Sequence, residues 1–236
     1  MGIGDFFNLI LYQPLFNFLI LLYTYLPGHD FGVAVIVLTL IIKLILLPTS
    51  LKSIRSQKIM ADLQPKLKEI QKKYKDDKEK QSREVFKLYQ ETKINPFSGC
   101  FPLLLQLPIL IALYQVFLKG FNEEVLKSTL YGFIPYSKQL NLMFLGLIDL
   151  TQPNIFLALT AGGLQFIQSK ISTPKKTSSQ KDTSQMIQSQ MMYFIPILTI
   201  FIVWKFGSII GLYWITSTLF SIGEHYLVTK KIKTNA

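Results

Sequence analysis

The chain has very few residues of the kinds on which most enzymes and metalloproteins depend. Among its 236 residues there is one cysteine, Cys100, and there are two histidines, His29 and His225. A single cysteine excludes an internal disulfide framework and any metal site built from several cysteines. Neither histidine has a nucleophile or ligand partner at a useful spacing, and the zinc-protease, serine-hydrolase and nucleotide-loop signatures are missing. The sequence therefore predicts a protein that is not an enzyme and uses no cofactor or metal.

Lysine and arginine are absent from residues 1–42, so the N-terminus lacks the basic region of a cleavable signal peptide. We expect this first segment to remain on the mature protein. Half of all residues are apolar, the mean hydropathy is +0.33, and uncharged runs recur at lengths close to the ~20 residues of a spanning helix. Because irregular backbone cannot face lipid, these features predict an all-α integral membrane protein.

Five apolar segments are predicted to be transmembrane helices, at 31–51, 96–118, 153–171, 186–204 and 207–228. The whole of 96–228 then forms four spans, with an outer loop at 119–152 and a cytoplasmic loop at 172–185. Residues 229–236 form a short basic tail. The apolar segment 3–26, within the N-terminal region 1–30, is interrupted by Pro14. It is either a sixth span or a helix lying in the membrane interface, and its lack of basic residues favours the interfacial helix.

The distribution of basic residues orients these spans. Twenty lysines and arginines lie between the first and second spans, after the third span and in the tail, whereas the alternate loops hold four. The positive-inside rule places the twenty in the cytoplasm. The N-terminus is then outside and the C-terminus inside. Attraction of these basic segments to anionic lipids accounts for most of the net charge of +11.

The charged segment 52–95 has helical periodicity. Leu63, Leu67, Ile70 and Tyr74 follow the spacing of one narrow apolar stripe on a helix. Residues 75–78 predict a turn, and a second amphipathic helix follows at about 85–92. The segment is therefore predicted to form an antiparallel helical hairpin outside the membrane. Periodicity alone leaves open whether this hairpin has any task beyond folding on itself.

Lys43 lies inside the otherwise uncharged apolar run 31–47. A charge at the centre of a bilayer costs about 2.5–3.5 kcal/mol on insertion scales, and it normally faces a bundle interior or a water-filled cavity. The alternatives are a side chain that extends to the membrane surface, which lies about two helical turns away, and a buried ion pair. Glu224, near the inner end of the last span, is the best candidate partner for such a pair.

Other polar residues are predicted to share the membrane interior with Lys43. Thr39 lies one turn before it, Gln106 lies within the second span, and Gln165 and Gln168 lie toward the inner end of the third. The last span carries a polar stripe at helical spacing, made of Tyr213, Ser217, Ser221 and Glu224. Each residue alone is typical of an interhelical hydrogen bond. Together with a lysine they indicate a hydrated concavity.

These elements, taken in order, resemble the YidC–Oxa–Alb superfamily of membrane protein insertases. The matching strings are Thr39-Leu-Ile-Ile-Lys43 followed by Leu46-Leu47-Pro48, Leu63-Gln64-Pro65-Lys66-Leu67, Asn95-Pro96-Phe97-Ser98-Gly99-Cys100-Phe101-Pro102, Gln106-Leu107-Pro108 and Gly211-Leu212-Tyr213-Trp214. The resemblance implies an ATP-independent insertase with a hydrophilic groove enclosed by five helices. The groove residues are then Lys43, Thr39, Gln106, Gln168, Tyr213 and Trp214. The hairpin residues that receive substrate are Leu63, Pro65, Leu67 and Ile70.

The resemblance also implies binding partners, and the chain differs from the usual family pattern at two points. Nascent membrane proteins, the Sec translocon, translating ribosomes and anionic lipids are the expected partners of a monomer in the bacterial inner membrane. Family members usually carry arginine where this chain has Lys43, and lysine keeps the charge but lacks the planar fork of donors. The chain shows neither a large extracytoplasmic domain nor a long tail, so ribosome contact is expected to be weak. The remaining alternatives are a small ion or proton transporter that uses Lys43 and Glu224, and an assembly scaffold.

Overall fold

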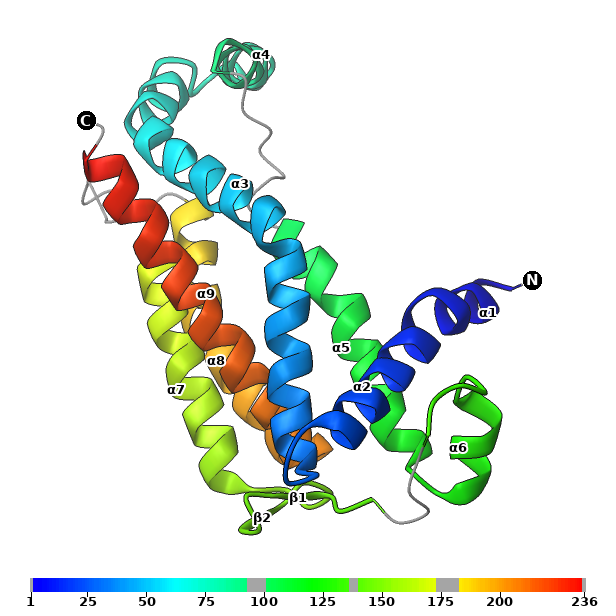
Figure 1. Ribbon diagram of the computed structural model, residues 1–236. Coiled ribbons are helices and arrows are strands. Elements are labelled where there is room, and N and C mark those ends of the chain that lie inside the picture. Colours follow the sequence, from blue (N-terminus) through cyan, green and yellow to red (C-terminus); the bar gives the residue numbers. More distant parts are fainter. Residues whose placement is uncertain (1, 93–100, 136–139, 173–182, 235–236) are drawn as a thin grey trace.

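The computed structural model describes residues 2–92, 101–135, 140–172 and 183–234, and within them the chain is mostly helical (Figure 1). The helices are α1 (Ile3–Phe7), the π-helix η1 (Asn8–Tyr12), α2 (Gln13–Tyr25), α3 (Phe31–Lys73), α4 (Lys78–Glu91), α5 (Phe101–Lys119), α6 (Glu123–Thr129), α7 (Ile155–Ser172), α8 (Thr183–Phe206) and α9 (Ser208–Thr234). Two short antiparallel strands, β1 (Met143–Phe144) and β2 (Ile148–Asp149), are the exception to the all-α prediction.

The predicted boundary between the first span and the hairpin does not exist as a break in the helix. α3 begins after Asp30, whose side chain accepts a hydrogen bond from the Val33 backbone N–H at 2.9 Å, and continues for 43 residues through Pro48 and Pro65. At ~1.5 Å per residue it is about 65 Å long, roughly twice the thickness of the hydrocarbon core. One helix therefore contains both the apolar run around Lys43 and the first arm of the charged hairpin.

The second arm of the hairpin is α4, which packs against α3. The predicted turn at 75–78 agrees with the end of α3 at Lys73 and the start of α4 at Lys78. Asp77 caps α4 by accepting a hydrogen bond from the Lys80 backbone N–H at 3.0 Å. The end of the predicted hairpin at residue 95 lies outside the described residues, as does most of the predicted cytoplasmic loop 172–185.

The long helices α3, α7, α8 and α9 form the main bundle, in which α3 contacts α9 and α7 contacts both α8 and α9. α5 contacts α3, α9 and the N-terminal segment. One end of the bundle, at the top of Figure 1, holds α4 and the C-terminal end of α9. The opposite end holds α6 and the β1–β2 hairpin. The two ends therefore contain the segments that the charge distribution assigns to opposite sides of a membrane.

The N-terminal helices run obliquely to the bundle (Figure 1). The chain does not break at Pro14, because α1, η1 and α2 follow one another without a gap and the proline comes directly after the π-helical turn. Within the described residues, two helical stretches are long and apolar enough to cross a membrane, Gly4–Tyr25 and Phe31–Lys73. Shorter apolar helices cover Leu105–Lys119 and Gln190–Phe206. The two alternatives for segment 3–26 therefore both stay predictions.

Packing within the bundle depends on aromatic and small residues. Near the start of α3, Phe31 meets Phe117 and Phe121 edge to face, and Phe121 stacks on Phe16. α7 presents small residues to α8, and a Cβ added to Gly162 would lie 2.3 Å from Ile200 Cγ1. Such close approach is typical of helices that associate in lipid.

Candidate functional site

α9 places its polar stripe inside the protein. Tyr213, Ser217, Ser221 and Glu224 have exposed fractions of only 3%, 6%, 9% and 3%. The helical spacing predicted that these residues share one face, and the structure places that face against the neighbouring helices. The interior of the bundle is therefore polar along much of α9.

This polar face connects α9 to α5 and α7. The side-chain amide of Gln106 on α5 donates a hydrogen bond to the Tyr213 hydroxyl. The indole N–H of Trp214 donates to Gln165 Oε1 on α7 at 2.9 Å. Two of the predicted groove residues, Gln106 and Tyr213, are thus in direct contact. A third, Trp214, follows Tyr213 in α9 and contacts α7 instead.

Lys43 connects α3 to the same face. Its ammonium group donates a hydrogen bond to Ser221 Oγ at 3.0 Å, so the side chain is directed at α9. It makes no direct ion pair with Glu224, although the two charges interact electrostatically. Ser50 and Ser221 also lie close to the Glu224 carboxylate, yet neither carboxylate oxygen accepts a hydrogen bond of normal geometry from a described residue.

The structure does not join Thr39 and Gln168 to this network. Thr39 is buried, with an exposed fraction of 1%, and its hydroxyl donates to the Val35 carbonyl of its own helix at 2.6 Å. Gln168 is half-buried on α7. Their assignment to a groove stays a prediction.

The hairpin residues have two different environments. Leu63 and Leu67 are buried, each with an exposed fraction of 7%, and Ile70 is half-buried. Pro65 is exposed. The apolar stripe is thus largely covered, since α3 and α4 pack together there. Only a portion of the predicted receiving surface is accessible in this conformation.

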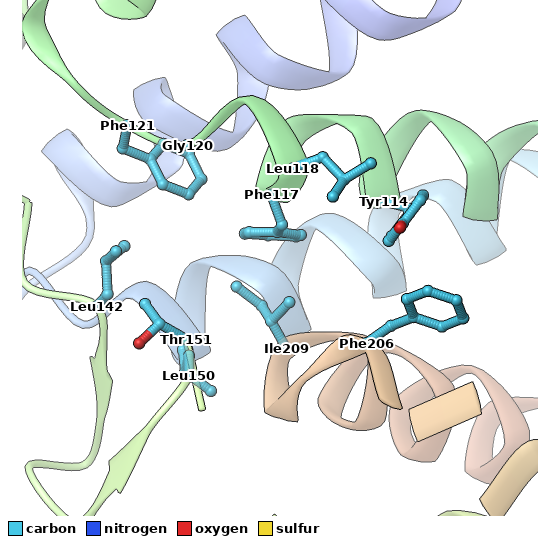
Figure 2. Close-up of a pocket in the computed structure, with 10 residues that line it drawn as sticks. All are labelled: Tyr114, Phe117, Leu118, Gly120, Phe121, Leu142, Leu150, Thr151, Phe206 and Ile209. Carbon is cyan, nitrogen blue, oxygen red and sulfur yellow. The ribbon is translucent and has the colours of Figure 1, made fainter. Parts of the chain in front are cut away.

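A separate cavity of about 190 Å³ lies near the C-terminal ends of α5 and α8 and the start of α9 (Figure 2). Its lining is predominantly apolar and aromatic: Tyr114, Phe117, Leu118, Gly120, Phe121, Leu142, Leu150, Thr151, Phe206 and Ile209. None of the predicted groove residues lines it. Because its lining is mostly apolar and holds no groove residue, it does not supply the hydrated concavity predicted from the sequence.

Sequence reasoning missed two polar contacts. Ser50 lies seven residues after Lys43, which places both on one face of α3 and identifies Ser50 by helical periodicity alone. The contact between Ser172 Oγ and His225 Nε2, at 3.0 Å, joins α7 to α9 near their C-terminal ends. Only the packing of the two helices reveals it, because helical spacing assigns each residue to a face but does not pair the two faces.

The helical fold, with polar contacts between long apolar helices and a charged hairpin at one end, is typical of a multi-pass membrane protein. Residues 21–235 match the family described as 60Kd inner membrane protein. The chain belongs to this family, the YidC/Oxa1 membrane protein insertases.

Relatives of similar and of greater length support this assignment. The chain is 41% identical over 207 residues to the membrane protein insertase YidC of Clostridium tetani, which covers 88% of this chain and 84% of that protein. It is 37% identical over 202 residues to the membrane protein insertase YidC of Fusobacterium nucleatum, and the match covers 86% of this chain and 87% of that protein. With that of Endomicrobium trichonymphae it is 36% identical over 218 residues, covering 91% of this chain and 39% of the longer relative.

Membership in this family establishes the function as membrane protein insertion, which is the work of a non-enzymatic chaperone whose substrates are nascent membrane proteins. The resemblance to insertases is thereby confirmed, and the transporter and scaffold alternatives are not supported.

Proposed function

We propose that this insertase moves short hydrophilic flanks of nascent proteins through a polar groove along α9, without ATP. The observation that supports this mechanism is the set of polar side chains that α3, α5 and α9 share at membrane depth: Lys43, Ser221, Gln106 and Tyr213. These groups replace some of the hydration that a flank loses when it leaves water. Transfer of the substrate's apolar helix into lipid then supplies the driving force.

Five helices span the membrane in this proposal: the first half of α3, then α5, α7, α8 and α9. The N-terminus lies outside and the C-terminus inside a bacterial inner membrane, with α1 and α2 lying in the outer interface. The opposite placement of α4 and of α6 in Figure 1 supports this orientation, as does the excess of basic residues on the α4 side. The chain then divides into five parts: an entry segment (1–30), the first span (31–51), the hairpin (52–95), the remaining spans (96–228) and the tail (229–236).

The hairpin of α3 and α4 is the first contact for substrate. Leu63, Pro65, Leu67 and Ile70 form the receiving surface, which is completed when α4 moves away from α3. The hairpin has few buried apolar residues, and α4 has none fully buried. Elements with so little burial open at low free-energy cost, which supports a mobile receptor at the cytoplasmic side.

The proposed partners are the Sec translocon, translating ribosomes and anionic lipids. The basic residues of α3 and α4 attract anionic lipid headgroups and ribosomal RNA electrostatically. We propose a monomer as the working unit, in which Thr39, Gln168 and Trp214 complete the wall of the groove.

The test is insertion by the purified protein alone. The protein is reconstituted in liposomes and offered a short single-span substrate without Sec, ribosomes or ATP. Protease protection of the translocated flank is expected, together with carbonate-resistant membrane integration. Liposomes without protein are the control for spontaneous insertion. Protection no greater than in empty liposomes would contradict an autonomous, ATP-independent mechanism.

A further inference from the structure

Glu224 is a buried carboxylate that the mechanism above does not use. Its exposed fraction is 3%, and neither of its oxygens accepts a hydrogen bond of normal geometry from the described residues. Burying such a group without donors is costly. The charged and polar groups that face it are Lys43 and Ser50 from α3 and Ser221 from α9. The adjacent His225 is bound to Ser172 on α7 instead.

Two sites on α9 are within reach of the Lys43 ammonium group. In the present conformation it donates to Ser221 at 3.0 Å. Glu224 lies three residues further along α9, and residues at this spacing are neighbours on a helix surface, with Cβ atoms about 5–6 Å apart. Because the lysine ammonium is carried on a flexible four-carbon chain, rotation of the side chain transfers it from the Ser221 hydroxyl to the Glu224 carboxylate.

We propose that Glu224 competes with acidic groups of the substrate for the Lys43 ammonium, and thereby determines how strongly this insertase prefers acidic flanks over neutral ones. The inference rests on the proposed groove function of Lys43. With the ammonium on Ser221, its charge is available to a carboxylate that enters the groove. With the ammonium on Glu224, the charge is neutralised and the acidic substrate is released. Glu224 therefore needs no contact with substrate, and it acts as a specificity-determining residue through Lys43.

The experiment compares two matched single-span substrates, with two Asp or two Asn in the translocated flank, in liposomes without a membrane potential. The readout is the ratio of protected acidic flank to protected neutral flank. Glu224→Gln removes the charge at nearly constant shape and is expected to raise this ratio about two- to fivefold, the range of a partly screened charge interaction. Glu124→Gln removes a charge from the exposed surface of α6 and is the matched control, with the ratio unchanged.

Competition for the ammonium is tested by repeating the comparison in a Lys43→Met protein. There Glu224→Gln is expected to leave the ratio unchanged, because no ammonium remains for which to compete. An unchanged ratio for Glu224→Gln in the Lys43 protein overturns the proposal, and so does an equal rise in the Lys43→Met protein. Should Glu224→Gln fail to fold, the uncharged Glu224→Ser must raise the ratio instead, and a wild-type ratio there overturns the proposal. Failure of the unmodified protein to insert either substrate overturns the groove function itself.

Discussion

At the scale of single residues, Lys43 illustrates how a charge is kept at membrane depth. It is anchored by a hydrogen bond to Ser221, and it interacts electrostatically with Glu224 without forming a direct ion pair. The side chain is therefore held by a contact on another helix, and no direct ion pair neutralises its charge. In the mechanism proposed above, this leaves the charge available to an acidic group of the substrate.

We predict that charge matters more than shape at this position. Lys43→Arg should retain insertion, whereas Lys43→Ala should reduce insertion of substrates with acidic flanks about tenfold or more, since a hydrogen bond to a charged group contributes about 1.5–3 kcal/mol. Neutral flanks should be affected less. The measurement is protease protection in liposomes, with Lys205→Ala, an exposed lysine at the end of α8, as the control. Full insertion of acidic flanks by a folded Lys43→Ala protein would contradict the charge role.

Asn17 is a second residue whose contacts define its role. Its side-chain amide donates to the carbonyls of Gln13 at 2.7 Å and Thr129 at 3.0 Å, and its Oδ1 accepts from the Tyr131 N–H at 2.7 Å. The exposed fraction is 2%. This one side chain therefore binds α2 to the segment that follows α6.

Replacing Asn17 should loosen that attachment. Asn17→Ala leaves the Tyr131 N–H without its acceptor and should lower the free energy of unfolding by about 1–3 kcal/mol. Denaturant titration in detergent measures the loss, and amide hydrogen exchange at Tyr131 should accelerate. Asn8→Ala changes an exposed amide on the preceding η1 and serves as the control. Equal stability of the two variants would show that the other contacts of α2, including the hydrogen bond from Gln13 to the Thr129 carbonyl, hold it without Asn17.

At the scale of the elements, the contact between α7 and α8 depends on Gly162. An added Cβ would meet Ile200 Cγ1 at 2.3 Å and the Pro196 carbonyl oxygen at 3.2 Å, whereas at Gly163 it would meet nothing within 4 Å. The two adjacent glycines thus differ only in the face of α7 on which they lie.

This difference predicts that alanine is destabilising at one of the two glycines and tolerated at the other. Gly162→Ala should force the helices apart and lower the free energy of unfolding by about 1–3 kcal/mol, the usual cost of overpacking. Gly163→Ala should be neutral or slightly stabilising, because alanine favours the helix. Thermal or denaturant unfolding in detergent measures both variants. A Gly162→Ala protein of unchanged stability would mean that α7 and α8 can move apart without lowering the free energy of unfolding.

The hairpin is the second element with a predicted function. Replacing 62–92 by a flexible linker should impair insertion while leaving the thermal stability of the bundle nearly unchanged, since α4 packs against α3 and buries no residue fully. Insertion and melting temperature are measured on the same preparation. Unfolding of the bundle after this deletion would show that the hairpin has a structural role instead of receiving substrate.

At the scale of the whole molecule, the prediction concerns orientation in the membrane. Ser82 on α4 and Ser128 on α6 are both exposed and lie at opposite ends of the bundle. In a Cys100→Ser background, a cysteine at position 128 should react with an impermeant maleimide on intact spheroplasts. A cysteine at position 82 should react only after permeabilisation. Reaction of both from the same side would exclude the five-span arrangement.

The sequence by itself determined the helical membrane class, the isolation of Lys43 and the shared face of Tyr213, Ser217, Ser221 and Glu224. These properties are local, because hydropathy and the 3.6-residue period depend only on neighbours in the chain. The turn at 75–78 was predicted for the same reason. The unbroken path of α3 was not, because a change from apolar to charged composition marks the membrane surface and says nothing about where a helix ends.

Only the tertiary structure decided which polar groups meet. Helical periodicity assigns a residue to a face, but the rotation and crossing of two packed helices determine the partner of that face. Lys43 therefore contacts Ser221 directly and not Glu224, although both lie on the predicted stripe. The pairing of Gln106 with Tyr213 and the oblique path of α2 arise in the same way. Each depends on the combined shapes of side chains from segments far apart in the sequence, and no local pattern contains that information.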